Sequence, residues 1–114
     1  MKAVIYHNPR CSKSRQALAL LEEAGADINV IEYLNNPPSE KALSALVKKL
    51  GVPAIDLVRT KEPEFKALGL SKTDSDMKLI AALTKEPKLI ERPIVITPNG
   101  ARIARPPELV KELL

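Results

Sequence analysis

Ten prolines divide this chain of 114 residues into short segments, and this punctuation limits its fold more than any other feature. Proline lacks a backbone N–H and disfavours a helix at the residue before it, so each one restricts where a helix or a central strand can run. No internal repeat or low-complexity tract overlaps these breaks. The ends of the elements can therefore be predicted from the sequence.

The first third of the chain predicts a strand, a helix and a second strand. Residues 2–6 form a β-branched and aromatic run that stops at Asn8-Pro9. From about Ser12 the apolar residues recur at helical spacing until Gly25, which suits a left-handed C-terminal cap. Residues 28–33 again have the composition of a strand. We expect a β-α-β unit with two parallel strands.

Residues 35 to about 86 are expected to be mainly helical. Ser39 is a suitable N-cap for a helix that Gly51 ends. Short helical turns are predicted at residues 53–57 and 63–68, and Asp74 or Ser75 could cap a further helix that continues to Pro87.

The sheet resumes near the C-terminus. Residues 93–97 predict a strand, and residues 102–104 predict its return after a turn in which Asn99-Gly100 accepts positive φ. Pro107 then opens a final helix. The order β-α-β, helices, β-β-α is typical of a thioredoxin-like α/β fold with a four-stranded mixed sheet. We expect one domain over residues 1–114, with a helical insertion at about 35–86.

Composition excludes several classes of protein. No apolar run approaches the roughly 18 residues of a membrane span, and no signal-peptide core follows Met1, so we expect a soluble cytoplasmic protein. The single cysteine rules out an internal disulfide and a cysteine-type zinc site, and no metal is expected. Three aromatic residues scattered among 18 basic and 14 acidic ones do not form a nucleic-acid surface.

Cys11 is the strongest candidate for chemistry, because it lies between the first strand and the first helix. The peptide N–H groups of Ser12, Lys13 and Ser14 have no partner within the helix and can point at the sulfur, which would lower its pKa. Arg10, Lys13 and Arg15 add positive charge. A thiolate is therefore expected, in a place that can also receive an oxyanion.

The neighbours of Cys11 allow more than one interpretation. A buried, inert cysteine is disfavoured because charged and polar residues flank it. His7 either helps to lower the Cys11 pKa or is a polar residue at the strand end, and the sequence does not choose. Ser14 either donates to the sulfur or, as we favour, is a solvated or capping residue. Ser14 also stands where a Cys-x-x-Cys pair would have its second cysteine, so an external thiol must resolve any covalent intermediate.

Six separated motifs resemble one family across essentially the whole chain, in order. They are His7-Asn8-Pro9-x-Cys11-x-x-Ser14-Arg15, Asn36-Pro37-Pro38-Ser39, Leu57-Val58-Arg59 with Glu62-Pro63, Leu68-Gly69-Leu70, Glu91-Arg92-Pro93-Ile94-Val95, and Gly100-Ala101-Arg102-Ile103-Ala104-Arg105-Pro106. The chain is identified by these motifs as similar to the ArsC family, the glutaredoxin-coupled arsenate reductases.

The resemblance implies a site and a reaction. Cys11 would be the nucleophile, kept ionised with help from His7, while Arg59, Arg92 and Arg105 hold the oxyanion. Ser14, Arg15 and Pro93 would support them, with a cis peptide before Pro93. Attack on arsenate would give a thiol-arsenate adduct, which glutathione and then glutaredoxin convert to arsenite. Glutathione is thus a co-substrate, and no cofactor is bound.

Each arginine also has a plain interpretation as a surface ion pair. For Arg59, beside Lys61 and Glu62, the two interpretations balance, and Arg102 is expected to be a solvated strand residue. Two other functions stay open: a general glutathione-linked thiol oxidoreductase, and a non-enzymatic module that binds RNA polymerase. The latter is disfavoured because such regulators usually carry Cys-x-x-Cys and lack this arginine set. We expect a monomer.

Overall fold

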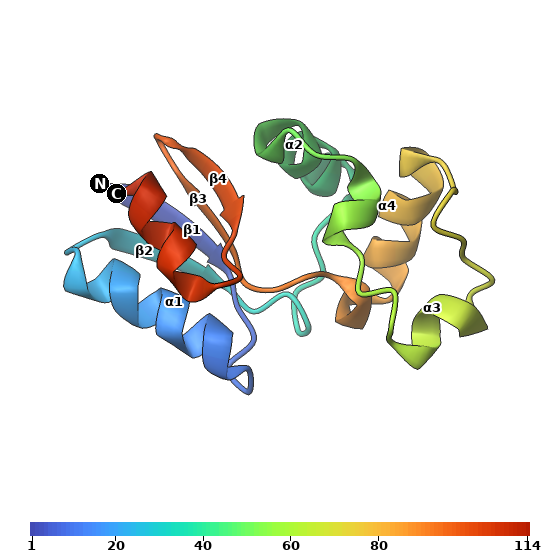
Figure 1. Ribbon diagram of the computed structural model, residues 1–114, viewed down its shortest axis with the longest axis horizontal. Coiled ribbons are helices and arrows are strands. Elements are labelled where there is room, and N and C mark those ends of the chain that lie inside the picture. The colour runs from blue at the N-terminus through green and yellow to red at the C-terminus, as the bar shows by residue number, and fades with distance from the viewer. The chain divides into compact units, whose positions relative to one another are not determined.

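The computed structural model describes residues 1–114, and its element order confirms the predicted one (Figure 1). In chain order, with η for a 3₁₀ helix, the elements are β1 (Lys2–Tyr6), α1 (Ser12–Glu23), β2 (Asp27–Ile31), α2 (Glu40–Leu50), η1 (Ala54–Leu57), α3 (Pro63–Ala67), α4 (Asp76–Lys85), η2 (Pro87–Leu89), β3 (Ile94–Thr97), β4 (Gly100–Ile103) and η3 (Pro107–Leu113). They form two compact units, residues 1–36 with 92–114, and residues 37–91.

The first unit contains a four-stranded mixed sheet in the order β2-β1-β3-β4, which confirms the predicted fold class. β1 and β2 are parallel, with Ile5 opposite Val30. β1 and β3 are antiparallel, with Ile5 opposite Val95, and β3 continues into β4 as an antiparallel hairpin. Because β1 is a central strand, the residues that follow it lie at the end of the strands, near the middle of the sheet.

α1 and η3 lie side by side on one face of this sheet and enclose its core (Figure 1). The fully or almost fully buried residues of this core come from both helices, from β1 and β3, and from the segment after β4: Ala3, Ile5, Ala17, Leu21, Val95, Ala104, Val110 and Leu113. The Leu113 carbonyl accepts hydrogen bonds from Thr97 Oγ1 at 2.9 Å and Asn99 Nδ2 at 3.0 Å. The hairpin therefore fixes the end of η3.

The last element is a 3₁₀ helix, although the sequence predicted only a helix. A 3₁₀ helix has three residues per turn, so residues three apart share one face. Pro107, Val110 and Leu113 have this spacing and are its buried residues. The packing of this face onto the sheet explains the tighter winding, which a general helix signal does not specify.

Two local predictions need correction. The second strand ends at Ile31 rather than Tyr33, because the chain turns there and the N–H groups of Asn35 and Asn36 both donate to the Glu32 carbonyl. The hairpin turn is present, but Gly100 alone has a positive φ there, at 140°, so Asn99 does not adopt the left-handed conformation. Glycine without Asn suffices for this turn.

The second unit is helical, as predicted. Ser39 caps α2 by accepting a hydrogen bond from the Ala42 N–H at 3.1 Å, and Gly51 ends the helix with a φ of 69°. Of the two candidate caps for α4, the structure selects Ser75, whose hydroxyl accepts from the Lys78 N–H at 3.3 Å. The core is formed by fully buried leucine and isoleucine side chains, including Leu43, Leu57, Leu79, Leu83, Leu89 and Ile90.

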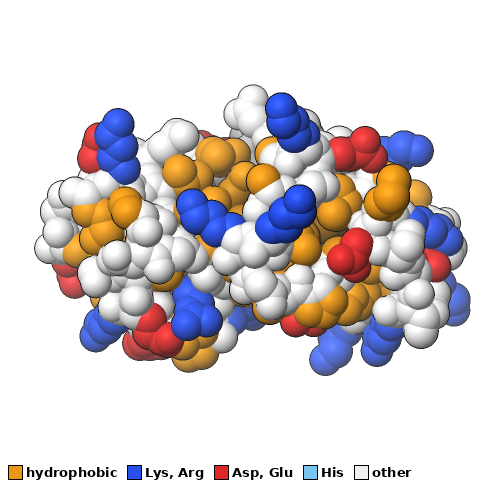
Figure 2. Space-filling model, turned by 90° about the horizontal axis from the view of Figure 1, so that it is seen from above, with side chains coloured by type: hydrophobic (Ala, Val, Ile, Leu, Met, Phe, Trp, Pro, Cys, Tyr) orange, Lys and Arg blue, Asp and Glu red, His pale blue; other side chains and the backbone are white.

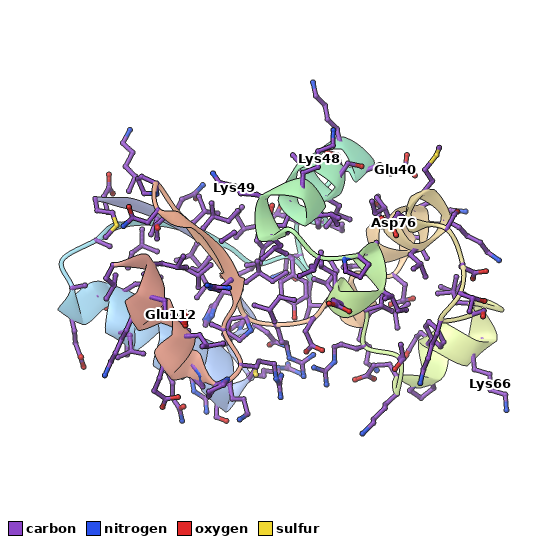
Figure 3. The ribbon with its side chains drawn as sticks, turned by 45° about the horizontal axis from the view of Figure 1, so that its top comes forward. Glu40, Lys48, Lys49, Lys66, Asp76 and Glu112 are labelled. Carbon is purple, nitrogen blue, oxygen red and sulfur yellow. The ribbon has the colours of Figure 1, made fainter.

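Charged side chains complement the ends of α2 in the second unit. Glu40 lies in the first turn, and Lys48 and Lys49 lie in the last, as Figure 3 shows. Acidic groups near a helix N-terminus and basic groups near its C-terminus interact favourably with the helix dipole. On the face drawn in Figure 2, basic side chains are interspersed with acidic and apolar ones. None of the helices has the length and apolar character to cross a bilayer.

Candidate active site

The loop after β1 places Cys11 at the start of α1. The His7 N–H donates to the Ile31 carbonyl at 2.8 Å, which extends the pairing of β1 with β2 by one residue. Asn8 then closes a tight turn, since its carbonyl accepts from the Cys11 N–H at 3.0 Å and its Oδ1 accepts from the Arg10 N–H at 3.0 Å. Cys11 is therefore the N-cap residue of α1, with extended backbone angles.

The Cys11 sulfur is partly exposed and surrounded by donors. Partial burial by itself raises the pKa of the thiol, but the Ser14 N–H, the Arg92 guanidinium and the Lys13 N–H hydrogen-bond the sulfur and outweigh it. The net result is a pKa below the ordinary value for cysteine. Since hydrogen bonds to the charged form favour that form, these groups make the Cys11 thiol easier to ionise.

The cation on the sulfur is Arg92, and not one of the basic residues of the loop itself. Arg92 lies two residues before β3 begins at Ile94, and its peptide bond to Pro93 is cis, as the resemblance implied. Burial lowers the Arg92 pKa, but the neighbouring Cys11 sulfur and Tyr33 raise it by more, so the net shift is upward. Because β3 lies beside β1 in the sheet, residues from opposite ends of the chain meet at the sulfur.

His7 and Ser14 form a buried pair behind the sulfur. His7 Nδ1 lies 2.6 Å from Ser14 Oγ, and the same hydroxyl accepts from the Asn8 N–H at 3.1 Å. Both side chains are almost completely buried, so the solvated role favoured for Ser14 is wrong. Ser14 therefore links His7 to Cys11. Its hydroxyl contacts the His7 ring, and its backbone N–H faces the Cys11 sulfur.

The His7 ring is held in its neutral form. Burial lowers the pKa of His7 most strongly; the Glu32 carboxylate raises it and the Arg15 guanidinium lowers it, with a net decrease. A neutral imidazole adds no positive charge to the site. Its contribution is therefore to hold Ser14 in place.

Arg105 and Arg15 each donate a hydrogen bond to a backbone carbonyl near the site. Arg105 Nη1 donates to the Arg92 carbonyl at 3.1 Å, and the Arg105–Pro106 peptide is a second cis bond that the sequence did not predict. Arg15 Nη1 donates to the Pro9 carbonyl at 2.9 Å and braces the loop. The Arg105 guanidinium is exposed. The structure therefore brings together Cys11 and Arg92, and joins Arg105 to Arg92.

Arg59 belongs to the second unit, where it forms ion pairs. Its Nε lies 3.3 Å from Glu62 Oε1, and its Nη1 lies 3.0 Å from Glu91 Oε1. The Val58–Ile90 bridge holds these two segments together, with the Arg59 N–H donating to the Leu89 carbonyl at 2.7 Å. The ion-pair interpretation of Arg59 is thus correct within this unit. Arg102 pairs with Glu112 at 3.3 Å and is half exposed, which confirms that it is a surface residue.

Tyr33 is a site residue that the sequence analysis missed. It lies in the turn after β2, is completely buried, and is among the groups that raise the Arg92 pKa. Aromatic content in a predicted strand is a signal for core packing, and nothing in the segment around Tyr33 indicates an interaction with Arg92, which precedes β3. Only the burial of a hydroxyl, which requires a partner, could have suggested such a role.

A mixed four-stranded sheet and a cysteine of lowered pKa at the start of the first helix define a thioredoxin-like protein. The ArsC family model matches residues 6–113. The chain belongs to the ArsC family.

Individual relatives agree over the full length of the chain. An arsenate reductase of Haemophilus influenzae is 45% identical, with all of both chains covered. The uncharacterized protein YfgD of Escherichia coli K12 is 48% identical over 96% of this chain and 94% of its own. The structure of an arsenate reductase from Vibrio cholerae has a TM-score of 0.94 and 49% identity, and the match covers 100% of this chain and 98% of that one.

Proposed function

We propose that this chain is an arsenate reductase in which Cys11 attacks arsenate. The observation that carries the proposal is the sulfur itself, which accepts hydrogen bonds from two peptide N–H groups and a guanidinium. Relatives that bear the name arsenate reductase are 40–45% identical. A thiolate at this position would be a nucleophile, and the hydrogen-bond donors around it could also bind the oxygens of an oxyanion.

The first step forms a sulfur–arsenic bond. The Cys11 thiolate attacks arsenic, and one arsenate oxygen leaves as water or hydroxide, while arsenic stays pentavalent. Once the sulfur has lost its negative charge, Arg92 and the N–H groups of Lys13 and Ser14 are available to the oxygens on arsenic. Guanidinium groups suit this role because they stay charged and meet oxygens in pairs. Arg105 and Arg59 are proposed as further oxyanion ligands.

The second step needs two external thiols, because the chain has only one cysteine. Arsenic gains two electrons and becomes arsenite, and two thiols lose two electrons in forming one disulfide. We assign these thiols to glutathione and then to glutaredoxin. The thiol of Cys11 is regenerated, so the electrons come entirely from the partners.

A pocket beside the loop supports a glutathione co-substrate. Its volume is about 290 Å³, and His7, Pro9, Arg10, Glu32, Leu34 and Asn35 line it. Glutathione carries carboxylates and an ammonium group, which are complementary to Arg10 and Glu32. Arg10 is also the residue next to Cys11, so the pocket adjoins the loop that carries the sulfur. We expect Arg10→Gln and Glu32→Gln to raise KM for glutathione and leave KM for arsenate unchanged, with Arg102→Gln as the control.

An assay of arsenite formation tests the proposal. Wild type should produce arsenite only when glutathione and glutaredoxin are both present, and Cys11→Ser should produce none. No turnover in the complete system would contradict the proposal. Faster reduction of a glutathione mixed disulfide than of arsenate would favour a general thiol oxidoreductase instead.

A further inference from the structure

Asn8 is hydrogen-bonded at three points of the loop that carries Cys11. Its N–H donates to Ser14 Oγ at 3.1 Å, its carbonyl accepts from the Cys11 N–H at 3.0 Å, and its side-chain Oδ1 accepts from the Arg10 N–H at 3.0 Å. The residue is almost completely buried. Burying an amide side chain is costly unless the amide is hydrogen-bonded, so the bond from Arg10 offsets part of that cost.

Only the bond to Oδ1 depends on the identity of the side chain. Every residue has a carbonyl, and every residue except proline has an N–H, so the other two bonds do not require asparagine. The bond from the Arg10 N–H to Oδ1 is an Asx turn, which a serine hydroxyl forms more weakly. It lies within the turn that the Cys11 N–H closes, where Pro9 presets φ at the second position.

This turn determines how the chain enters α1. Cys11 is the N-cap residue, with φ of −92° and ψ of 121°, and its carbonyl accepts the first helical bond, from the Arg15 N–H at 3.0 Å. An N-cap side chain lies next to the peptide N–H groups of the first turn, which have no partner within the helix. A restraint on the backbone before Cys11 therefore also restrains where its sulfur lies.

The same bond fixes the backbone of Arg10. Arg10 lines the pocket beside the loop, together with His7 and Glu32. The Asx turn thus acts on two neighbouring residues, one that carries the sulfur and one that lines the pocket.

We propose that the Asn8 side chain is a positioning residue, which holds Cys11 at the N-cap of α1 and Arg10 against the pocket. The proposal rests on the proposed function, in which Cys11 is the nucleophile and Arg10 binds glutathione. It adds a residue that acts through the backbone of the loop. All of the groups involved belong to the first unit.

A role in stability alone makes a different prediction. The loss of the Oδ1 bond in Asn8→Ala would then lower the free energy of unfolding, and Cys11 in the folded variant would react as in the wild type. Under the positioning role the folded variant itself changes. The loop before Cys11 loses a restraint, and the first-turn N–H groups stabilise the thiolate less well.

The experiment measures iodoacetamide alkylation of folded protein against pH, without arsenate. We expect Asn8→Ala to move the pH profile upward and to slow alkylation at pH 7 about threefold. Asn8→Ser, which can re-form the turn, should recover part of this loss. Ser39→Ala is the matched control, because it removes a side-chain hydrogen bond of 3.1 Å to a peptide N–H in the second unit. It should leave the profile unchanged.

An unchanged profile in Asn8→Ala, or a loss that Asn8→Ser does not reduce, would overturn the proposal. In turnover assays Asn8→Ala should also raise KM for glutathione, and in an Arg10→Gln background it should raise KM no further. An equal rise in both backgrounds would contradict the action through Arg10. If the wild type alkylates normally but reduces no arsenate, the proposed function fails, and the alkylation profiles still decide the role of Asn8.

Discussion

At the scale of single residues, the charge of Arg92 is central. Burial raises the Cys11 pKa, and Arg92 is the one charged side chain among the groups that lower it. Replacing it by glutamine keeps a hydrogen-bond donor and removes the charge. We expect Arg92→Gln to raise the apparent pKa of Cys11 and to slow iodoacetamide alkylation at pH 7 about tenfold.

The matched control for this prediction is Arg102→Gln, which removes an arginine engaged in a surface ion pair with Glu112. Such pairs contribute about 0–1 kcal/mol to stability and have no contact with the sulfur. A pH profile that is the same for wild type and Arg92→Gln would show that peptide N–H groups alone set the pKa of Cys11.

His7, the only histidine, should make stability depend on pH. Burial keeps the His7 pKa in the folded protein below the ordinary value of about 6.5. Below that pH the unfolded chain therefore binds a proton more readily than the folded protein, and the free energy of unfolding falls as pH decreases. We expect urea unfolding to show this decline between pH 7.5 and 5, and His7→Gln to show a shallower one. Equal slopes would refute the assignment.

The sequence located Cys11 and its loop, because a cysteine between a strand and a helix start is a local signal. It also predicted the peptide N–H groups of Lys13 and Ser14 on the sulfur, which the structure confirms, but it did not predict the cation. The expected cations were neighbours in sequence, whereas the cation in contact is Arg92, which the fold brings from the far end of the chain. The effect of Tyr33 on the Arg92 pKa is non-local in the same way. Sequence neighbours are visible without a fold, but partners across a sheet are not.

At the scale of elements, α2 owes its start to one hydroxyl. Ser39 accepts a hydrogen bond from the Ala42 N–H, and an N-cap serine contributes about 1 kcal/mol. We expect Ser39→Ala to lower the free energy of unfolding by about that amount. Ser44→Ala in the exposed middle of the same helix should raise it by a few tenths of a kcal/mol, because alanine has the higher helix propensity. Chemical denaturation of both variants measures the difference, and effects of the same sign would contradict it.

Element boundaries were predictable where a residue type dictates the backbone. Ser39 and Gly51 mark the two ends of α2 for this reason. Boundaries set by tertiary contacts were not predictable. β2 ends where β1 turns away after His7, and η3 winds as a 3₁₀ helix because its buried residues must face the sheet at a spacing of three. Neither cause is present in the segment itself.

At the scale of the whole molecule, each compact unit has its own core. Leu21 is completely buried in the first and Leu83 in the second. We expect either Leu→Ala change to cost about 2–5 kcal/mol of stability. If the chain is one cooperative domain, as we expect, each variant shifts the same single unfolding transition. Two transitions, each moved by only one of the variants, would contradict the single domain.

The peptide N–H donors at Cys11 bear on how such a protein changes over generations. Lys13 and Ser14 contribute through their main chain, which every amino acid except proline would supply equally. Mutation can therefore exchange the side chains of Lys13 and Ser14 while their share of the sulfur's activation persists from ancestor to descendant. A scaffold of this kind can alter which oxyanion it accepts without first having to reinvent its nucleophile.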